Sequence, residues 1–124
     1  MRLQESGEMY LEAILVLSQR QSAVRSVDVG EYLGYSKPSV SRAMGILRQG
    51  GYVQSDEDGF LTLTDSGRAV AEKIYERHTV LTSLLTALGV DKKIAAQDAC
   101  RMEHVISDET FRALQRHAAA KGWK

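Results

Sequence analysis

The segment between Ser26 and Leu63 constrains the fold most strongly. A short stretch with apolar periodicity begins near Ser26 and ends at Gly34, and glycine is the usual residue just past a helix. Ser36 and Pro38 then carry the signals that start a second helix, because serine can cap its first turn and proline fits there without losing a hydrogen bond. Two helices joined by so short a turn predict a helix-turn-helix.

A β-hairpin is predicted directly after the second helix, which ends at Gly50-Gly51. Strand-forming residues at 52–54 and 60–63 flank Ser55-Asp56-Glu57-Asp58-Gly59, whose Asp-Gly pair is a hairpin turn signal. A helix-turn-helix followed by a hairpin is a winged helix. The acidic tip of this wing would be repelled by phosphates, so we expect it to lie away from a nucleic-acid backbone.

The remaining segments read as helices. One proline and 6% aromatic residues also favour a mostly α protein. Spacing and capping signals predict further helices at about 6–19, 64–88, 91–106 and from Ser107 onward, with Ala118 to Lys124 as a fraying end. We therefore expect an N-terminal winged helix-turn-helix domain at residues 1–64 and a C-terminal helical domain at residues 65–124, which the family resemblance given below makes the metal-binding and dimerisation domain.

Charge is distributed unevenly along the chain. The formal net charge is zero, but residues 20–50 hold five basic and two acidic residues, which leaves +3 there and −3 in the remainder. Such an asymmetry is a weak indication that one domain binds phosphates. Arg42 and the residues around the helix start at Ser36 would provide the contacts.

Two further properties bear on the location of the protein. The chain has a single cysteine, so it has no internal disulfide framework, and a reducing compartment is expected. It also lacks a run of about 20 apolar residues, the length that spans a bilayer. We expect a cytoplasmic protein with no membrane partner.

Cys100, Glu103 and His104 form a candidate metal site. Helical positions i, i+3 and i+4 share one face, so a thiolate, a carboxylate and an imidazole would converge. These ligand types suit Fe(II), Zn(II) or Co(II) better than Mg(II) or Ca(II). On this segment alone, a buried cysteine beside an exposed Glu-His pair is an equally good interpretation.

With this motif following a winged helix, the chain resembles the diphtheria-toxin-repressor family of metal-dependent transcriptional repressors, which includes manganese-transport regulators. The resemblance runs from Glu8-Met9-Tyr10-Leu11 through residues 98–104 to Val105-Ile106-Ser107-Asp108-Glu109, and in length the chain resembles the short, two-domain members. Iron-type members bind the activating metal through a Met on the first helix and Cys, Glu and His on the fifth. The resemblance assigns these roles to Met9, Cys100, Glu103 and His104, whereas manganese-type members have Asp and Glu in place of Met9 and Cys100.

The resemblance also implies a second metal position. Family members place there a His of the long helix, which His78 matches, and manganese-type members add a Glu that Glu12 matches. Iron-type members use a further Glu and His, where this chain has Thr82 and Ala96. The iron-type second site is therefore expected to be incomplete. Met9 as a core residue and His78 as a solvated one are the simpler interpretations.

These features predict a homodimeric, metal-activated repressor that binds palindromic operator DNA and controls metal-homeostasis genes, and that is not an enzyme. Fe(II) is the expected metal and Mn(II) the alternative, while Zn(II), Co(II) or Ni(II) can substitute in vitro. The predicted DNA contacts are Ser36, Lys37, Pro38, Ser39 and Arg42. Two other functions stay open: a metal-independent winged-helix regulator with Cys100 as a thiol sensor, and, ranked last, a metalloenzyme on a helical bundle.

Overall fold

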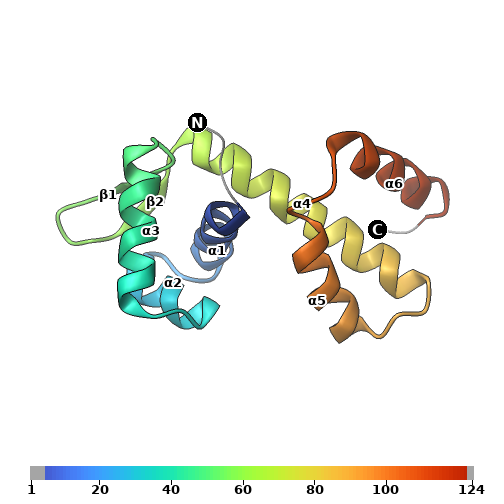
Figure 1. Cartoon of the computed structure of the whole chain (residues 1–124), viewed down its shortest axis with the longest axis horizontal. Helices are drawn as coiled ribbons and strands as arrows, with labels where there is room; N and C mark the ends of the chain where they lie inside the picture. The colour runs from blue at the N-terminus through green and yellow to red at the C-terminus, as the bar shows by residue number, and fades with distance from the viewer. Residues whose placement is uncertain (1–4, 123–124) are drawn as a thin grey trace. The chain divides into compact units, whose positions relative to one another are not determined.

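Figure 1 shows the computed structural model of the chain, in which residues 5–122 are described. Within that range the order of elements is three helices, two strands and three helices. The chain forms two compact units, the first ending at Glu72 and the second beginning at Lys73. A mostly α fold with one small sheet confirms the predicted fold class.

The first unit contains α1 (Glu5–Arg20), α2 (Ser26–Leu33), α3 (Lys37–Gln49), β1 (Val53–Ser55) and β2 (Leu61–Leu63). Each element contributes apolar side chains to one core, in which α1 is buried from Tyr10 to Leu17 except at Glu12. Leu11 and Ile14 of α1, Val29 of α2 and Met44 of α3 are almost completely buried there. The core thus depends on the amphipathic faces that the sequence displays.

The helix-turn-helix forms where it was predicted. Gly34 ends α2 in the left-handed conformation, with a φ of 75°, and its N–H donates to the carbonyl of Gly30. The side chain of Ser36 accepts a hydrogen bond from the backbone N–H of Ser39, and Pro38 occupies the first turn of α3. Both predicted capping signals are therefore confirmed.

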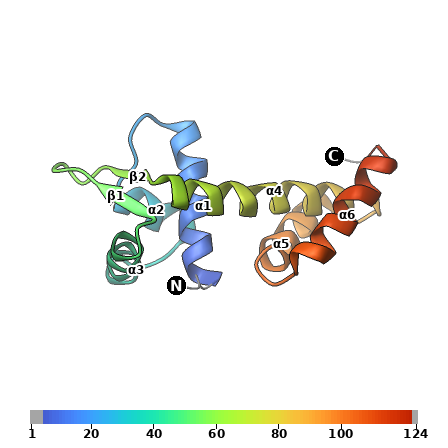
Figure 2. The same cartoon turned by 90° about the horizontal axis from the view of Figure 1, so that it is seen from above.

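The wing is an antiparallel hairpin in which Val53 faces Leu63 and Ser55 faces Leu61. The N–H of Leu61 also donates to the carbonyl of Val24, at 2.7 Å, so the segment before α2 runs along the other edge of β2. At the tip, the Asp56 carboxylate accepts hydrogen bonds from the backbone N–H groups of Asp58 and Phe60. In both views the hairpin extends from one side of the first unit (Figure 1, Figure 2).

A close backbone contact joins the hairpin to the start of α4 (Asp65–Ala87). The hydroxyl of Thr64 donates to the carbonyl of Gly51 and accepts from the N–H of Gly67. Gly67 packs so tightly that a Cβ atom added there would lie 2.0 Å from the carbonyl oxygen of Tyr52. Only glycine permits this approach.

The second unit contains the later part of α4 together with α5 (Lys92–Met102) and α6 (Asp108–Ala120). Two predictions about it were wrong. The fifth helix was expected to reach Ile106 but ends at Met102, and the chain then turns. Ala118 was expected to belong to a fraying end, but it lies in α6 and is 3% exposed because it packs into the unit.

Candidate metal centre and nucleic-acid surface

The carboxylate of Glu103 lies between two imidazoles of the second unit. Its Oε2 atom is 3.0 Å from Nδ1 of His78, and its Oε1 atom is 3.4 Å from Nε2 of His104. The side chains of Glu103 and His104 are fully buried, and that of His78 is 30% exposed. The structure therefore joins a residue predicted for the second metal position, His78, to two residues predicted for the first.

This cluster fits a divalent cation. Oε1 of Glu103 is buried and accepts no hydrogen bond from any described residue, since its contact with His104 lacks hydrogen-bond geometry. A buried carboxylate oxygen without a hydrogen bond is costly, and a bound cation offsets that cost. Carboxylate and imidazole groups are also ordinary ligands of Fe(II), Mn(II) and Zn(II).

The turn after α5 positions Glu103 and His104. Glu103 keeps a helical backbone conformation, and its N–H donates to the carbonyl of Ala99. The N–H groups of Val105 and Ile106 both donate to the carbonyl of Met102, so His104 lies in a tightened last turn rather than in a continuing helix. Cys100 lies inside α5 and is half-buried. The expected helical spacing of the three residues therefore holds only as far as Glu103.

Met9 and Glu12 lie on α1, in the first unit, and both are half-buried. Met9 is not part of the buried apolar core described above. Its sulfur accepts a hydrogen bond from the Tyr35 hydroxyl at 3.1 Å, so it lies in polar surroundings. That environment argues against the simpler interpretation of Met9 as a core residue.

Sequence reasoning missed Arg77, which is only 5% exposed. One of its terminal nitrogens donates to the carbonyls of Glu103 and Ile106, and the other to the carboxylate of Asp108. Lys73, and then Arg77, hold the pKa of the Asp108 carboxyl below its usual value by hydrogen bonding and by their charge. The sequence did carry a signal for Arg77, because it interrupts the apolar stripe of α4 between Ile74 and Leu81 at helical spacing.

Thr82 and Ala96 occupy the positions at which, by the family resemblance, iron-type members have Glu and His. Both are half-buried, and the Thr82 hydroxyl oxygen is buried. A threonine hydroxyl is a weaker metal ligand than a carboxylate, and alanine offers no ligand atom.

The residues predicted to contact DNA lie at the start and on the outer face of α3. Ser36, Lys37, Pro38, Ser39 and Arg42 are all exposed. Val40, Met44 and Leu47, on the opposite face, are buried in the core. Two of the predicted contacts, Lys37 and Arg42, are therefore exposed cationic side chains on a well-anchored helix.

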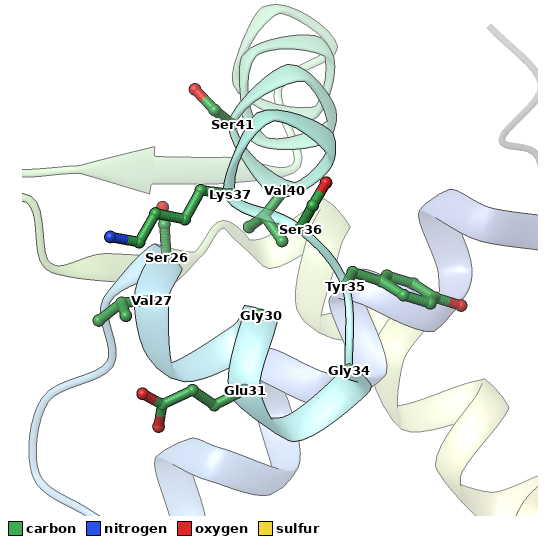
Figure 3. Close-up of a pocket in the computed structure, with 10 residues that line it drawn as sticks. All are labelled: Ser26, Val27, Gly30, Glu31, Gly34, Tyr35, Ser36, Lys37, Val40 and Ser41. Atoms are coloured by element: carbon green, nitrogen blue, oxygen red, sulfur yellow. The ribbon is translucent and has the colours of Figure 1, made fainter.

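A hollow with a volume of about 570 Å³ lies between α2 and the first turn of α3 (Figure 3). Gly30 lines it, and a Cβ atom there would lie 3.3 Å from both the Tyr35 carbonyl and the Val40 side chain. Lys37 lines it as well, whereas the ring of Tyr35 points away from the other lining side chains. The hollow thus adjoins the surface that α3 exposes.

Within residues 5–122, no helix has the length and apolar character that crossing a membrane requires.

Two family models match the chain. The model of the iron dependent repressor N-terminal DNA binding domain matches residues 2–60, and that of the iron dependent repressor metal binding and dimerisation domain matches residues 64–119.

Curated relatives match over nearly the whole chain. It is 31% identical to an uncharacterized HTH-type transcriptional regulator of Methanocaldococcus jannaschii, over 91% of this chain and 92% of the relative. It is 34% identical to the transcriptional regulator MntR of Escherichia coli, over 89% of this chain and 74% of MntR. The diphtheria toxin repressor of Corynebacterium efficiens is also 34% identical, over 90% of this chain, which spans 49% of that repressor's length.

Solved structures show the same fold. A manganese-dependent transcriptional repressor in complex with manganese is 28% identical, with a TM-score of 0.84 over 91% of this chain and 52% of the other. The manganese regulator SloR is 25% identical, with a TM-score of 0.81 over 96% of this chain and 55% of its own. The chain therefore belongs to the iron-dependent repressor family of metal-dependent transcriptional repressors, which includes the diphtheria toxin repressor and MntR.

Proposed function

We propose that this chain is a homodimeric repressor that Fe(II) activates to bind palindromic operators of metal-homeostasis genes. Residues 1–64 would bind DNA, and residues 65–124 would hold the metal and form the dimer. The observation that carries the proposal is the buried Glu103 carboxylate. The His78 imidazole lies 3.0 Å from one of its oxygens, and the His104 imidazole lies 3.4 Å from the other. Burying a carboxylate in a helical domain is costly unless its charge is compensated, and a bound cation would compensate it.

Four residues would hold the activating ion: Met9 from α1, Cys100 from α5, and Glu103 and His104 from the turn that follows. The two sulfur atoms favour a softer ion than Mn(II), which prefers oxygen ligands. Support for Met9 comes from its position outside the buried core and from the polar contact of its sulfur with Tyr35. Fe(II) is therefore the proposed physiological metal.

These ligands would control DNA binding because they belong to both units of the chain. Residues of α1 and of the turn after α5 that held one ion would restrain the winged helix relative to the dimerisation domain. Two recognition helices enter successive major grooves only when they are about 34–36 Å apart. A chain without metal would sample many separations, and metal binding would select the competent one.

A manganese-responsive repressor is the alternative. The contact between His78 and Glu103 favours it, because it provides an oxygen and a nitrogen ligand at the second metal position without the Glu and His of iron-type members. Glu12 would add a second carboxylate. In this arrangement Glu103 would be shared between two ions.

DNA-binding titrations of the purified chain with Fe(II), Mn(II) and Zn(II) under anaerobic conditions test the proposal. We expect tight operator binding with Fe(II), weaker binding with Mn(II), and loss of binding on addition of a chelator. Stronger activation by Mn(II) would establish the alternative. Binding that ignores the chelator but changes on oxidation of Cys100 would instead show a thiol sensor.

A further inference from the structure

Arg77 lies within the apolar stripe of α4, at a position where the helical pattern predicts an apolar residue. Its neighbours in the buried stripe of the helix are Ile74 and Leu81, which are 2% and 0% exposed. The guanidinium lies 5.4 Å from the centre of the Phe111 ring of α6, a cation–π contact. Burying an arginine requires compensation by hydrogen bonds, so its partners show what it does there.

All its hydrogen-bond acceptors lie between Glu103, just after α5, and Asp108, the first residue of α6. One terminal nitrogen of Arg77 donates to the carbonyl of Glu103 at 3.1 Å and to that of Ile106 at 2.8 Å. The other donates to the Asp108 carboxylate. These carbonyls lie at and just beyond the negative end of the α5 dipole, where a cation is stabilising. The guanidinium thus adds contacts at both ends of the turn to the backbone bonds from Val105 and Ile106 to Met102.

Glu103 is consequently held from both sides by two consecutive residues of α4. Arg77 binds its main-chain carbonyl, and His78 contacts its carboxylate at 3.0 Å. The direction of a side chain follows its backbone, so the turn that Arg77 fixes determines where the carboxylate of Glu103 lies. His104 belongs to the same turn and depends on the same restraint.

We propose that Arg77 is a positioning residue of the metal centre, which it serves by fixing the backbone of the turn that carries Glu103 and His104. This inference rests on the proposed function, because it assumes that these two residues bind the metal. A planar guanidinium can reach three acceptors in fixed directions, whereas a lysine ammonium at this position could not replace all three contacts. Arg77 need not touch the ion.

Binding of Co(II) to the full-length chain tests the role of Arg77, because the visible spectrum of Co(II) reports the geometry of its ligands. For Arg77→Lys we expect an affinity about 10- to 100-fold lower, as for other groups that orient metal ligands. We also expect a changed spectrum at saturating Co(II). A merely structural role would lower thermal stability but leave the spectrum of the saturated site unchanged. Equal affinity and an identical spectrum would overturn the proposal.

Lys73→Gln is the matched control. Lys73 contacts the same Asp108 carboxylate at 2.9 Å, but its side chain is 55% exposed and contacts neither carbonyl of the turn. We expect this variant to bind Co(II) as the parent does. If Arg77→Lys does not fold, Asp108→Asn decides, because it weakens the anchor of Arg77. Weaker Co(II) binding than in Lys73→Gln supports the proposal, and equal binding overturns it.

The same titration separates this proposal from the proposed function. A parent chain that binds no Co(II) would refute the metal centre itself. A parent that binds Co(II) with an affinity that Glu103→Gln lowers, while Arg77→Lys leaves affinity and spectrum unchanged, would refute only the role of Arg77.

Discussion

Glu103 places an ionisable carboxylate, with two histidines beside it, in the interior of the second unit. Its carboxylate is fully buried, yet one of its oxygens accepts no hydrogen bond from the described residues. In a core designed only for stability, such an oxygen would be replaced by an apolar group, since an unsatisfied buried acceptor costs about 1–3 kcal/mol. Retaining it beside two histidines makes sense if folding leaves a site for a cation. Stability of the apo protein and affinity for metal are therefore opposed at this residue.

Cys100→Ser tests the sulfur ligand most directly. We expect the variant to lose metal-dependent DNA binding, because a serine hydroxyl does not replace a soft thiolate. Helical content should stay unchanged, since a half-buried serine is tolerated in α5. DNA binding measured by fluorescence anisotropy with and without Fe(II), beside circular dichroism, checks both expectations. Retention of the parental metal dependence would show that Cys100 is not a ligand.

Metal choice can be tested by exchanging both sulfur ligands for carboxylates. In the double variant Met9→Asp with Cys100→Glu, the site contains only oxygen and nitrogen ligands, so the response should shift from Fe(II) toward Mn(II). The measurement is the concentration of each ion that half-saturates operator binding. An unchanged order of the two ions would mean that these two positions do not determine selectivity.

At the scale of elements, local sequence signals predicted most of the fold. The caps at Gly34 and Ser36, the Asp-Gly turn and the apolar stripes each act within a few residues, so they are legible in the sequence. The end of α5, by contrast, could not be predicted from the sequence. Arg77 binds the turn after that helix from 26 residues away in the chain. A helix terminus fixed by such a distant side chain leaves no local signal.

The candidate site divides in the same way. The motif at Cys100, Glu103 and His104 was visible because its residues are close in sequence, and His78 was assigned only by family resemblance. That His78 contacts Glu103 could not be predicted, because the contact depends on how α4 packs against the turn after α5. Arg77 was overlooked because a charged residue on a long helix is usually solvated.

Gly67 joins two elements by a contact that any side chain would prevent. We expect Gly67→Ala to destabilise the chain by about 1–3 kcal/mol, because the new Cβ would clash with the backbone carbonyl of Tyr52. Gly45→Ala is the matched control: it lies within α3, where a Cβ meets no atom within 4 Å. There alanine should stabilise by about 0.5–1 kcal/mol through helix propensity. Urea denaturation measures both, and equal effects would contradict the packing argument.

The outer face of α3 should separate into residues that read bases and residues that bind phosphates. As a base contact, Arg42 would contribute about 1–3 kcal/mol, so Arg42→Ala should relax sequence preference at one position of each half-site. Lys37→Ala should weaken binding to all sequences and lower the salt dependence by about one unit per contact. Titrations against operator and scrambled DNA at two salt concentrations distinguish these roles. Parental binding by both variants would refute α3 as the recognition helix.

At the scale of the whole molecule, the proposed ligand set predicts that metal binding affects both units of the chain. If Met9 of α1 and Glu103 share one ion, Fe(II) should slow amide hydrogen exchange in both α1 and α5. Stabilisation follows the ratio of free metal to dissociation constant, about 2.7 kcal/mol at a hundredfold excess. Exchange measured with and without Fe(II) under anaerobic conditions tests this. Protection confined to the second unit would exclude Met9 as a ligand.

The way α3 is built also affects how such a protein can diverge in evolution. The helix is held by the cap at Ser36 and by Val40, Met44 and Leu47 on its buried face. Lys37, Ser39 and Arg42 point away from that core, so substitutions there cost little folding free energy. Duplicated copies of the gene could acquire new operator preferences by changing these positions alone, while the scaffold and its metal response stay constant.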